Sequence, residues 1–291
     1  MGLGPAAQLV AVGVDDGRAA AAAARYAAAV ALARGWDLML VHGGGRPEEA
    51  VDDGDALLER VLASLALRPA TRVHRLVTAD AVVDALRRVS GLVSVLALGQ
   101  DRATLSDPLV LGGVAATVTS AARGTVVLVP RGWDREHGAG RPVAAALEAT
   151  EPAGPALRCA FVEADLDGVP VVVVRTPAGT TERGEDDEEA AGREGAYAEA
   201  LTDARREHPG VEARTVLVPG DPATWVPDPG VLASLVVAGP PRACLPAGAW
   251  ARSAAGPLLQ RSACPLLVAP SDDGPPAPRS GLRRRARARR R

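Results

Sequence analysis

The sequence has few aromatic side chains and contains no lysine, isoleucine or asparagine. Aromatic residues make up 2% of its 291 residues, while hydrophobic residues make up 47%. Any core must therefore be built from alanine, valine and leucine. The chain is long enough for two ordinary domains, each with a core of its own. Every basic residue is an arginine, which is typical of GC-rich coding, so the abundance of alanine and arginine says little about function.

Cysteine is scarce, and long uninterrupted apolar runs are absent. Cys159, Cys244 and Cys264 have no C-x-x-C spacing and lie in apolar segments, which fits a reducing compartment better than a disulfide framework. No run of about 18 apolar residues lacks charged or turn residues. Residues 1–8 have neither the basic start nor the apolar core of a secretion signal. The sequence predicts a cytoplasmic protein with no transmembrane segment.

The charge is unevenly distributed along the chain. The formal net charge is −2, yet residues 279–291 hold eight arginines and no acid, so a basic tail follows an acidic body. The segment from residue 271 onward is also rich in proline, which predicts a disordered tail. It has no aromatic residues for base stacking, so we expect no sequence-specific nucleic-acid partner.

Apolar strands and helical patterns alternate through the first half of the chain. The predicted strands cover residues 9–14, 38–42, 72–77, 92–98 and 125–129. The predicted helices cover residues 19–34, 56–67, 80–89 and 114–122, the third of them capped by Asp80. This alternation predicts an α/β fold in which helices cover both faces of a parallel sheet.

Several turn and glycine residues follow the predicted strands directly. Asp15 follows the first strand, His42 ends the second with Gly43 directly after it, and Gly99 follows the fourth. In doubly wound sheets ligands bind beyond the carboxyl ends of the strands, so these residues should converge there. The long loop after Gly99 leads to a helix that begins near Val114. Such a helix start offers free backbone N–H groups to an anion.

The pattern of the first half recurs roughly 140 residues later, which indicates a duplication. The corresponding strands are predicted at residues 142–147, 169–174, 213–218, 232–238 and 265–268. We therefore expect a first domain over 1–131, a linker over 132–141, a second domain over 142–270 and a tail over 271–291. The last strands of the two domains are expected to pair within the chain, which would protect both edges.

Four short motifs together resemble a universal stress protein domain. They are Gly13-Val14-Asp15, Leu40-Val41-His42, Leu96-Ala97-Leu98-Gly99 and Val126-Val127-Leu128-Val129-Pro130. The resemblance implies two tandem doubly wound domains and an adenine nucleotide, ATP, accompanied by Mg²⁺ only when ATP is bound. The binding residues that it implies in the first domain are Val14, Asp15, Gly43, Gly99, Arg102, Gly112, Gly113 and Val114.

The sequence departs from this family's glycine-rich loop at particular positions. Arg102 stands where the family has its second glycine, so it either fills the pocket or holds a phosphate. Gly113 stands where the family has a hydroxyl residue. In the second half Glu148 replaces the aspartate, and Pro240 and Pro241 remove two backbone donors. We expect no nucleotide in the second half.

The sequence offers no catalytic or metal-binding pattern. The four histidines have no partner at helical spacing, and no Gly-x-Ser-x-Gly elbow is present. The leading interpretation is a stress-response regulatory or binding protein that senses ATP through its first domain and acts on an unidentified protein partner. Two alternatives stay open: a nucleotide-free interaction scaffold and a slow ATP hydrolase. An intramolecular pseudo-dimer is expected, and further homodimerisation is left open.

Overall fold

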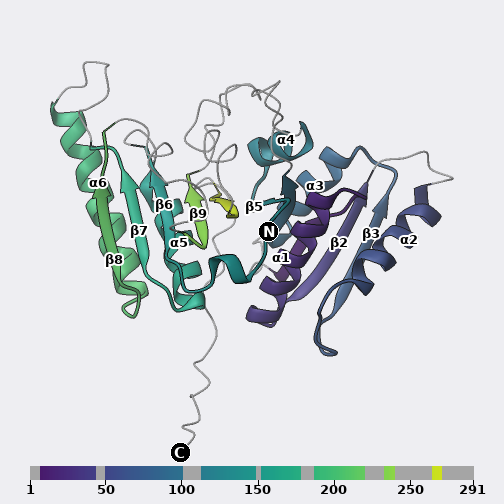
Figure 1. Cartoon of the computed structure of the whole chain (residues 1–291). Helices are drawn as coiled ribbons and strands as arrows, with labels where there is room; N and C mark the ends of the chain where they lie inside the picture. The colour runs from purple at the N-terminus through teal and green to yellow at the C-terminus, as the bar shows by residue number, and fades with distance from the viewer. Residues whose placement is uncertain are drawn as a thin grey trace, which may run out of the picture.

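The computed structural model describes residues 7–43, 50–100, 113–148, 152–177, 187–219, 233–239 and 264–270. Within these ranges, ten strands form one sheet in the order β3-β2-β1-β4-β5-β10-β9-β6-β7-β8. Figure 1 shows two similar halves that meet in the middle of this sheet. The first half comprises β1–β5 with α1–α4, and the second comprises β6–β10 with α5 and α6.

The elements of the first half follow the predicted alternation. They are β1 (Ala7–Gly13), α1 (Arg18–Arg34), β2 (Asp37–Gly43), α2 (Ala50–Ala63), β3 (Val73–Thr78), α3 (Val82–Ser90), β4 (Val93–Gln100), α4 (Gly113–Ala121) and β5 (Thr125–Pro130). A 3-10 helix, η1 (Glu136–Gly138), lies in the connection to the second half. Gly35 ends α1 in the left-handed conformation, with φ at 66°, as expected for a helix-terminating glycine.

The second half repeats this sequence of elements over the residues that are described. They are β6 (Val143–Leu147), α5 (Ala153–Asp167), β7 (Val171–Arg175), α6 (Asp187–Glu207), β8 (Ala213–Leu217), β9 (Leu235–Ala238) and β10 (Leu266–Val268). Pro240, Pro241 and the Arg-rich tail lie outside the described residues.

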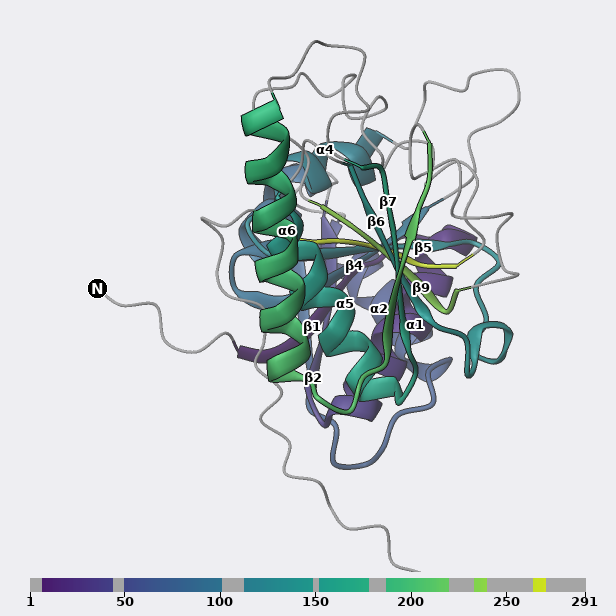
Figure 2. The same ribbon diagram turned by 90° about the vertical axis from the view of Figure 1, so that its left-hand side faces the viewer.

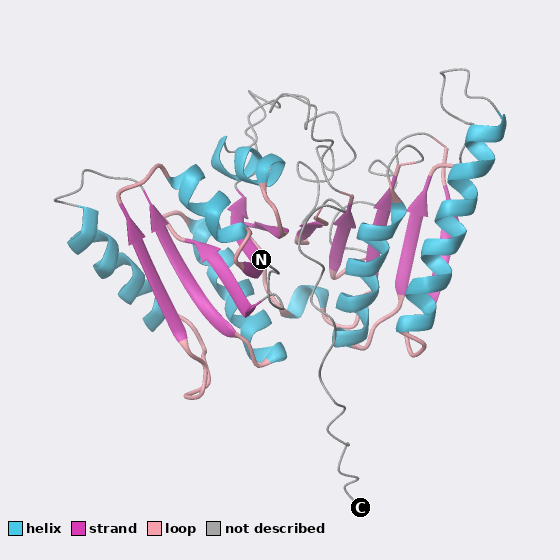
Figure 3. Cartoon of the chain, turned by 180° about the vertical axis from the view of Figure 1, so that it is seen from behind, coloured by secondary structure: helices cyan, strands magenta, loops and turns pink. Residues whose placement is uncertain are grey.

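The two halves have the same internal strand order, which is third, second, first, fourth, fifth. Strands within each half are parallel, whereas β5 and β10 pair antiparallel, with Leu266 opposite Leu128 and Val268 opposite Val126. The pairing of the two last strands was predicted, and it joins the halves into one continuous sheet. Figure 3 shows the long strands of both halves running toward the same side of the molecule. The strands fan out in Figure 2, as sheet twist requires.

Helices cover both faces of the sheet, as the sequence predicted. Val10 and Val12 of β1 pack on one face in a core cluster that includes side chains of α1, α2, α5 and α6. Ala11 points to the other face, where it joins side chains of α3 and α4. The alternation follows from the two-residue period of a strand. The first cluster runs without interruption across the junction, because it contains both Val127 and Leu267.

Several predicted boundaries were wrong, and one cap was misassigned. Gly99 was predicted to follow the fourth strand, but β4 continues to Gln100 because its pairing with β5 continues to that residue. Gly43 likewise lies within β2, where it pairs with Thr78. Asp80 does not cap α3, whose N-cap is Ala81 with no side-chain cap. The carboxylate of Asp80 instead pairs with the guanidinium of Arg88.

Candidate functional site

The ends of β1 and β2 are held together by two hydrogen bonds. The backbone N–H of Val14 donates to the carbonyl of Val41 at 2.8 Å. Nδ1 of His42 lies 2.8 Å from the carbonyl oxygen of Val14, and because a carbonyl only accepts, this nitrogen carries the proton and donates. His42 therefore fixes the backbone of Val14 at the carboxyl edge of the sheet.

Asp15 forms the turn that leads from β1 into α1. Its Oδ1 accepts a hydrogen bond from the backbone N–H of Gly17 at 2.8 Å, and the residue is exposed. Gly17 is the N-cap of α1 and provides no side-chain cap, and no acid lies in the first helical turn. A negative group at this helix start would meet the positive end of the helix dipole. Asp15 thus shapes the turn before α1.

Two of the four glycines of the predicted site, Gly43 and Gly99, lie where helices pack closely on strands. A Cβ at Gly99 would lie 2.3 Å from the backbone carbon of Ala19, at the start of α1. A Cβ at Gly43 would lie 3.2 Å from Cα of Val82, at the start of α3. At both positions a helix start packs closely against a strand end. This packing accounts for glycine at both positions without any ligand.

The structure brings together Val14, Asp15, Gly43 and Gly99 at one edge of the sheet. Gly113 and Val114 open helix α4, which follows β4, and Val114 is exposed. The first turn of α4 carries no acid. Arg102 and Gly112 lie outside the described residues. The described part of the predicted site is therefore a set of strand ends together with the starts of α1 and α4, whose first turns carry no acid.

The same edge of the second half contains an ion pair between a buried arginine and an exposed glutamate, which sequence analysis missed. Arg175, the last residue of β7, is 4% exposed and donates to both carboxylate oxygens of Glu194 at 2.7 and 2.6 Å. Its guanidinium lies 3.9 Å from the ring centroid of Tyr197. Both partners of Arg175, Glu194 and Tyr197, lie on α6. In the sequence, the one signal of this contact was an arginine at the end of an apolar strand. Glu148, the counterpart of Asp15, follows β6 and is half-buried.

Neither a metal cluster nor a membrane span is found where the chain is described. No group of three or more His, Cys, Asp or Glu side chains in those ranges could hold a metal ion. Across the same ranges, no helix has the length and apolar character needed to cross a bilayer.

Comparison with known proteins identifies the fold. No protein-family model and no curated protein matches the sequence. Among solved structures, a universal stress protein from Archaeoglobus fulgidus DSM 4304 matches with a TM-score of 0.63 at 14% identity, over 92% of this chain and 99% of that one. A putative universal stress protein from Pseudomonas aeruginosa UCBPP-PA14 matches with a TM-score of 0.56 at 15% identity, over 92% and 95%. The cytoplasmic domain of a prokaryotic cation chloride cotransporter matches with a TM-score of 0.50 at 12% identity, over 92% and 96%. The fold is that of universal stress proteins, as predicted.

Proposed function

We propose that this chain is a regulatory binding protein of the universal stress type, which takes one adenine nucleotide at the carboxyl edge of its first half. The observation that carries the proposal is the pair of hydrogen bonds that fixes Val14 between Val41 and His42, directly beside the exposed Asp15. In the same proposal, residues 1–131 and 142–270 are the two domains, joined by 132–141.

The chemistry of this edge suits a nucleotide with a polar base and an anionic tail. Val14 uses its N–H on Val41 and its carbonyl on His42, so these bonds fix the edge of the sheet. The backbone of Gly43 is then the strand-end group offered to a base, and the Asp15 carboxylate is an acceptor for ribose or base donors. The starts of α1 and α4 carry no acid, so their unpaired N–H groups can receive phosphate oxygens. Gly113 supplies such an N–H, and Mg²⁺ would arrive with ATP rather than occupy a site of its own.

Binding is assigned to the first half alone because the second half uses its corresponding edge differently. There Arg175 and Glu194 satisfy each other in a two-pronged ion pair. A buried cation that is already paired gains little from a phosphate. Glu148 also places a longer carboxylate where Asp15 makes its turn.

The proposal predicts unequal effects from two matched substitutions. Calorimetric titration of ATP with Mg²⁺ into the full chain should give saturable heat with about one site. Asp15→Ala should weaken this binding roughly tenfold, equivalent to about 1.4 kcal/mol, because it removes an acceptor and loosens the turn before α1. Glu148→Ala is the matched control and should change the dissociation constant less than about twofold, which is a few tenths of a kcal/mol.

Other outcomes would select the alternatives. Equal weakening by both substitutions would contradict the assignment to the first half. An absence of saturable heat at millimolar ATP would favour a nucleotide-free scaffold that acts through protein contacts. Steady turnover of bound ATP that is lost in Asp15→Ala would favour the slow hydrolase.

A further inference from the structure

A second pocket lies at the junction of the two halves, far from the nucleotide crevice. It has a volume of about 280 Å³ and is lined by residues of α1, of α5 and of the connection between the halves. Figure 1 shows α1 and α5 on either side of the line where the halves meet. Helix α1 begins at the edge proposed for the nucleotide, and its residues from Tyr26 to Arg34 line the pocket, about 12 to 25 Å along the helix at 1.5 Å per residue. The two sites are therefore separate.

Arg34, the last residue of α1, is a buried cation in this pocket with a spare donor. The residue is 7% exposed, its guanidinium lies 4.7 Å from the Trp36 ring centroid, and its Nη2 pairs with the carboxylate of Glu163. Within the described part of the chain, its buried Nη1 has no hydrogen-bond partner. A buried charged donor without an acceptor is costly, so this atom calls for an acceptor oxygen.

Two acids on α5 share the pocket with this single buried cation. Glu163 and Asp167 are one helical turn apart and both line the cavity. Burial raises the pKa of the Asp167 carboxyl above its ordinary value, and the nearby Glu163 raises it further, while Arg34 and the exposed Arg135 act in the opposite direction. Asp167 is exposed at the rim, and Arg135 also lines the cavity, so the lining carries two acids and two arginines and its formal charges balance. A ligand with one charge of each sign would keep this balance, whereas a singly charged ligand would disturb it.

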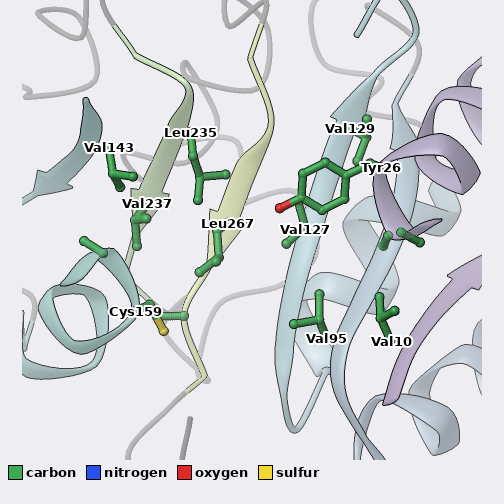
Figure 4. Packing of buried hydrophobic residues seen from close by; sticks show 14 of the residues in the cluster. Val10, Tyr26, Val95, Val127, Val129, Val143, Cys159, Leu235, Val237 and Leu267 are labelled. Atoms are coloured by element: carbon green, nitrogen blue, oxygen red, sulfur yellow. The ribbon is translucent and has the colours of Figure 1, made fainter. Parts of the chain in front are cut away.

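The remaining walls are small and apolar, and they limit the size of an occupant. Ala29 and Ala33 of α1 and Leu166 of α5 line the cavity. Tyr26 meets Trp133 edge-on, with ring centroids 5.3 Å apart, and Figure 4 shows the Tyr26 hydroxyl pointing toward the second half. A volume of about 280 Å³ lies just below the usual range for drug-sized ligands, so the cavity has room for a small molecule.

We propose that this junction pocket binds a small zwitterion of the amino-acid class. Its carboxylate lies against the guanidinium groups of Arg34 and Arg135, its ammonium group lies against Asp167 and Glu163, and its side chain contacts the apolar wall. Such a ligand meets an opposite charge at each end, whereas a simple anion would meet two acids and a simple amine would meet two arginines. The site is independent of the proposed nucleotide crevice.

Calorimetry on the full-length chain tests the proposal directly. The common L-amino acids are titrated in pools and then singly, with acetate and methylamine as probes that carry only one of the two charges. We expect saturable heat, with about one site per chain, from at least one amino acid, and none from acetate or methylamine at the same millimolar concentration. No saturable amino-acid binding, or equal binding of either single-charge probe, would overturn the proposal.

Substitutions then locate the site. Asp167→Asn should weaken amino-acid binding roughly tenfold, while Asp203→Asn, an exposed aspartate of α6 that is 52% exposed, should leave it unchanged. A double substitution, Arg34→Met with Glu163→Met, replaces the buried pair by apolar side chains and should abolish binding while the chain stays folded. If the double variant unfolds, the comparison of Asp167→Asn with Asp203→Asn decides alone. Unchanged binding by Asp167→Asn would overturn the assignment.

Discussion

A methyl group at position 99 would lie 2.3 Å from the backbone carbon of Ala19 and 2.5 Å from its oxygen. No ordinary contact is this short, so Gly99→Ala must push α1 away from β4. We expect a loss of about 1 to 3 kcal/mol in the free energy of unfolding, measured by urea denaturation. Gly192→Ala on the exposed face of α6 is the control, because a Cβ there meets nothing within 4 Å. It should stabilise the protein by about 0.5 to 1 kcal/mol through helix propensity.

Gly99 shows that a glycine pattern in the sequence does not by itself indicate a ligand site. Gly99 was predicted from its resemblance to a nucleotide loop, and the structure explains it fully by helix packing. If Gly99→Ala were as stable as the natural chain, that explanation would be wrong and a ligand-based reason would be needed. Sequence alone could not separate the two reasons, since both require a residue without a side chain at the end of β4.

Helix α6 packs apolar side chains into the core of its half and adds a few polar contacts to the sheet. The carboxylate of Glu194 accepts hydrogen bonds from both terminal nitrogens of Arg175, Nη1 and Nη2. The hydroxyl of Tyr197 lies 2.7 Å from that of Thr215. Glu194→Gln should lower the unfolding free energy by about 1 kcal/mol at neutral pH, because Arg175 is buried and keeps only one acceptor. Glu189→Gln removes an exposed pair with Arg193 on the same helix and should cost less than about 0.5 kcal/mol.

The pH dependence of this pair has a definite sign. Hydrogen bonds from Arg175 hold the pKa of Glu194 below its ordinary value of 4.5. The stabilisation is therefore present above pH 4.5 and is lost as the pH falls through the lowered pKa. Urea denaturation of the natural chain and of Glu194→Gln should give converging stabilities in acid. A difference that stays constant down to low pH would contradict the role of the ionised carboxylate.

Sequence patterns predicted the kinds and order of the elements better than their ends. The apolar runs of β1 and β4 and the alanine pattern of α1 are local signals, so they could be interpreted without the fold. The end of β4 depends on its pairing with β5. At the start of α3, the carboxylate of Asp80 pairs with Arg88 instead of capping the helix. Such contacts between distant or folded-back segments leave no local signal. That Val14, Asp15 and Gly43 lie at one edge of the sheet was foreseeable, because topology alone places strand ends together.

At the scale of the whole molecule, the junction makes stability depend on pH through Asp167. Burial and Glu163 raise its pKa above the ordinary value of 3.8, so the folded chain keeps this proton at a pH where the unfolded chain has released it. Stability therefore falls as the pH rises through that interval. Asp167→Asn should be more stable than the natural chain at neutral pH, and the gain should disappear in acid. Thermal unfolding at both pH values measures this, with Asp203→Asn as the control.

The junction pocket could not be predicted from any single segment of the sequence. Arg34 and Glu163 meet only because β5 and β10 pair, which brings α1 and α5 together. The proposed ligand site gives a combined test, since Asp167→Asn should raise stability without ligand and lower amino-acid affinity. A binding group that destabilises its own fold is common at functional sites. A variant that lost stability at neutral pH would show that Arg34 and Arg135 outweigh the cost of burial.

The antiparallel pairing of β5 with β10 joins two halves that belong to one polypeptide. In a dimer of identical chains, one surface must fit its own copy, so equivalent positions carry the same residue. Here Arg34 and Asp167 stand at equivalent positions, each directly before a left-handed glycine that ends its helix, and they carry opposite charges. A covalent connection also keeps each half at a millimolar effective concentration of the other. Dilution therefore cannot part the two halves, and each has been free to change its sequence against a partner that is always present.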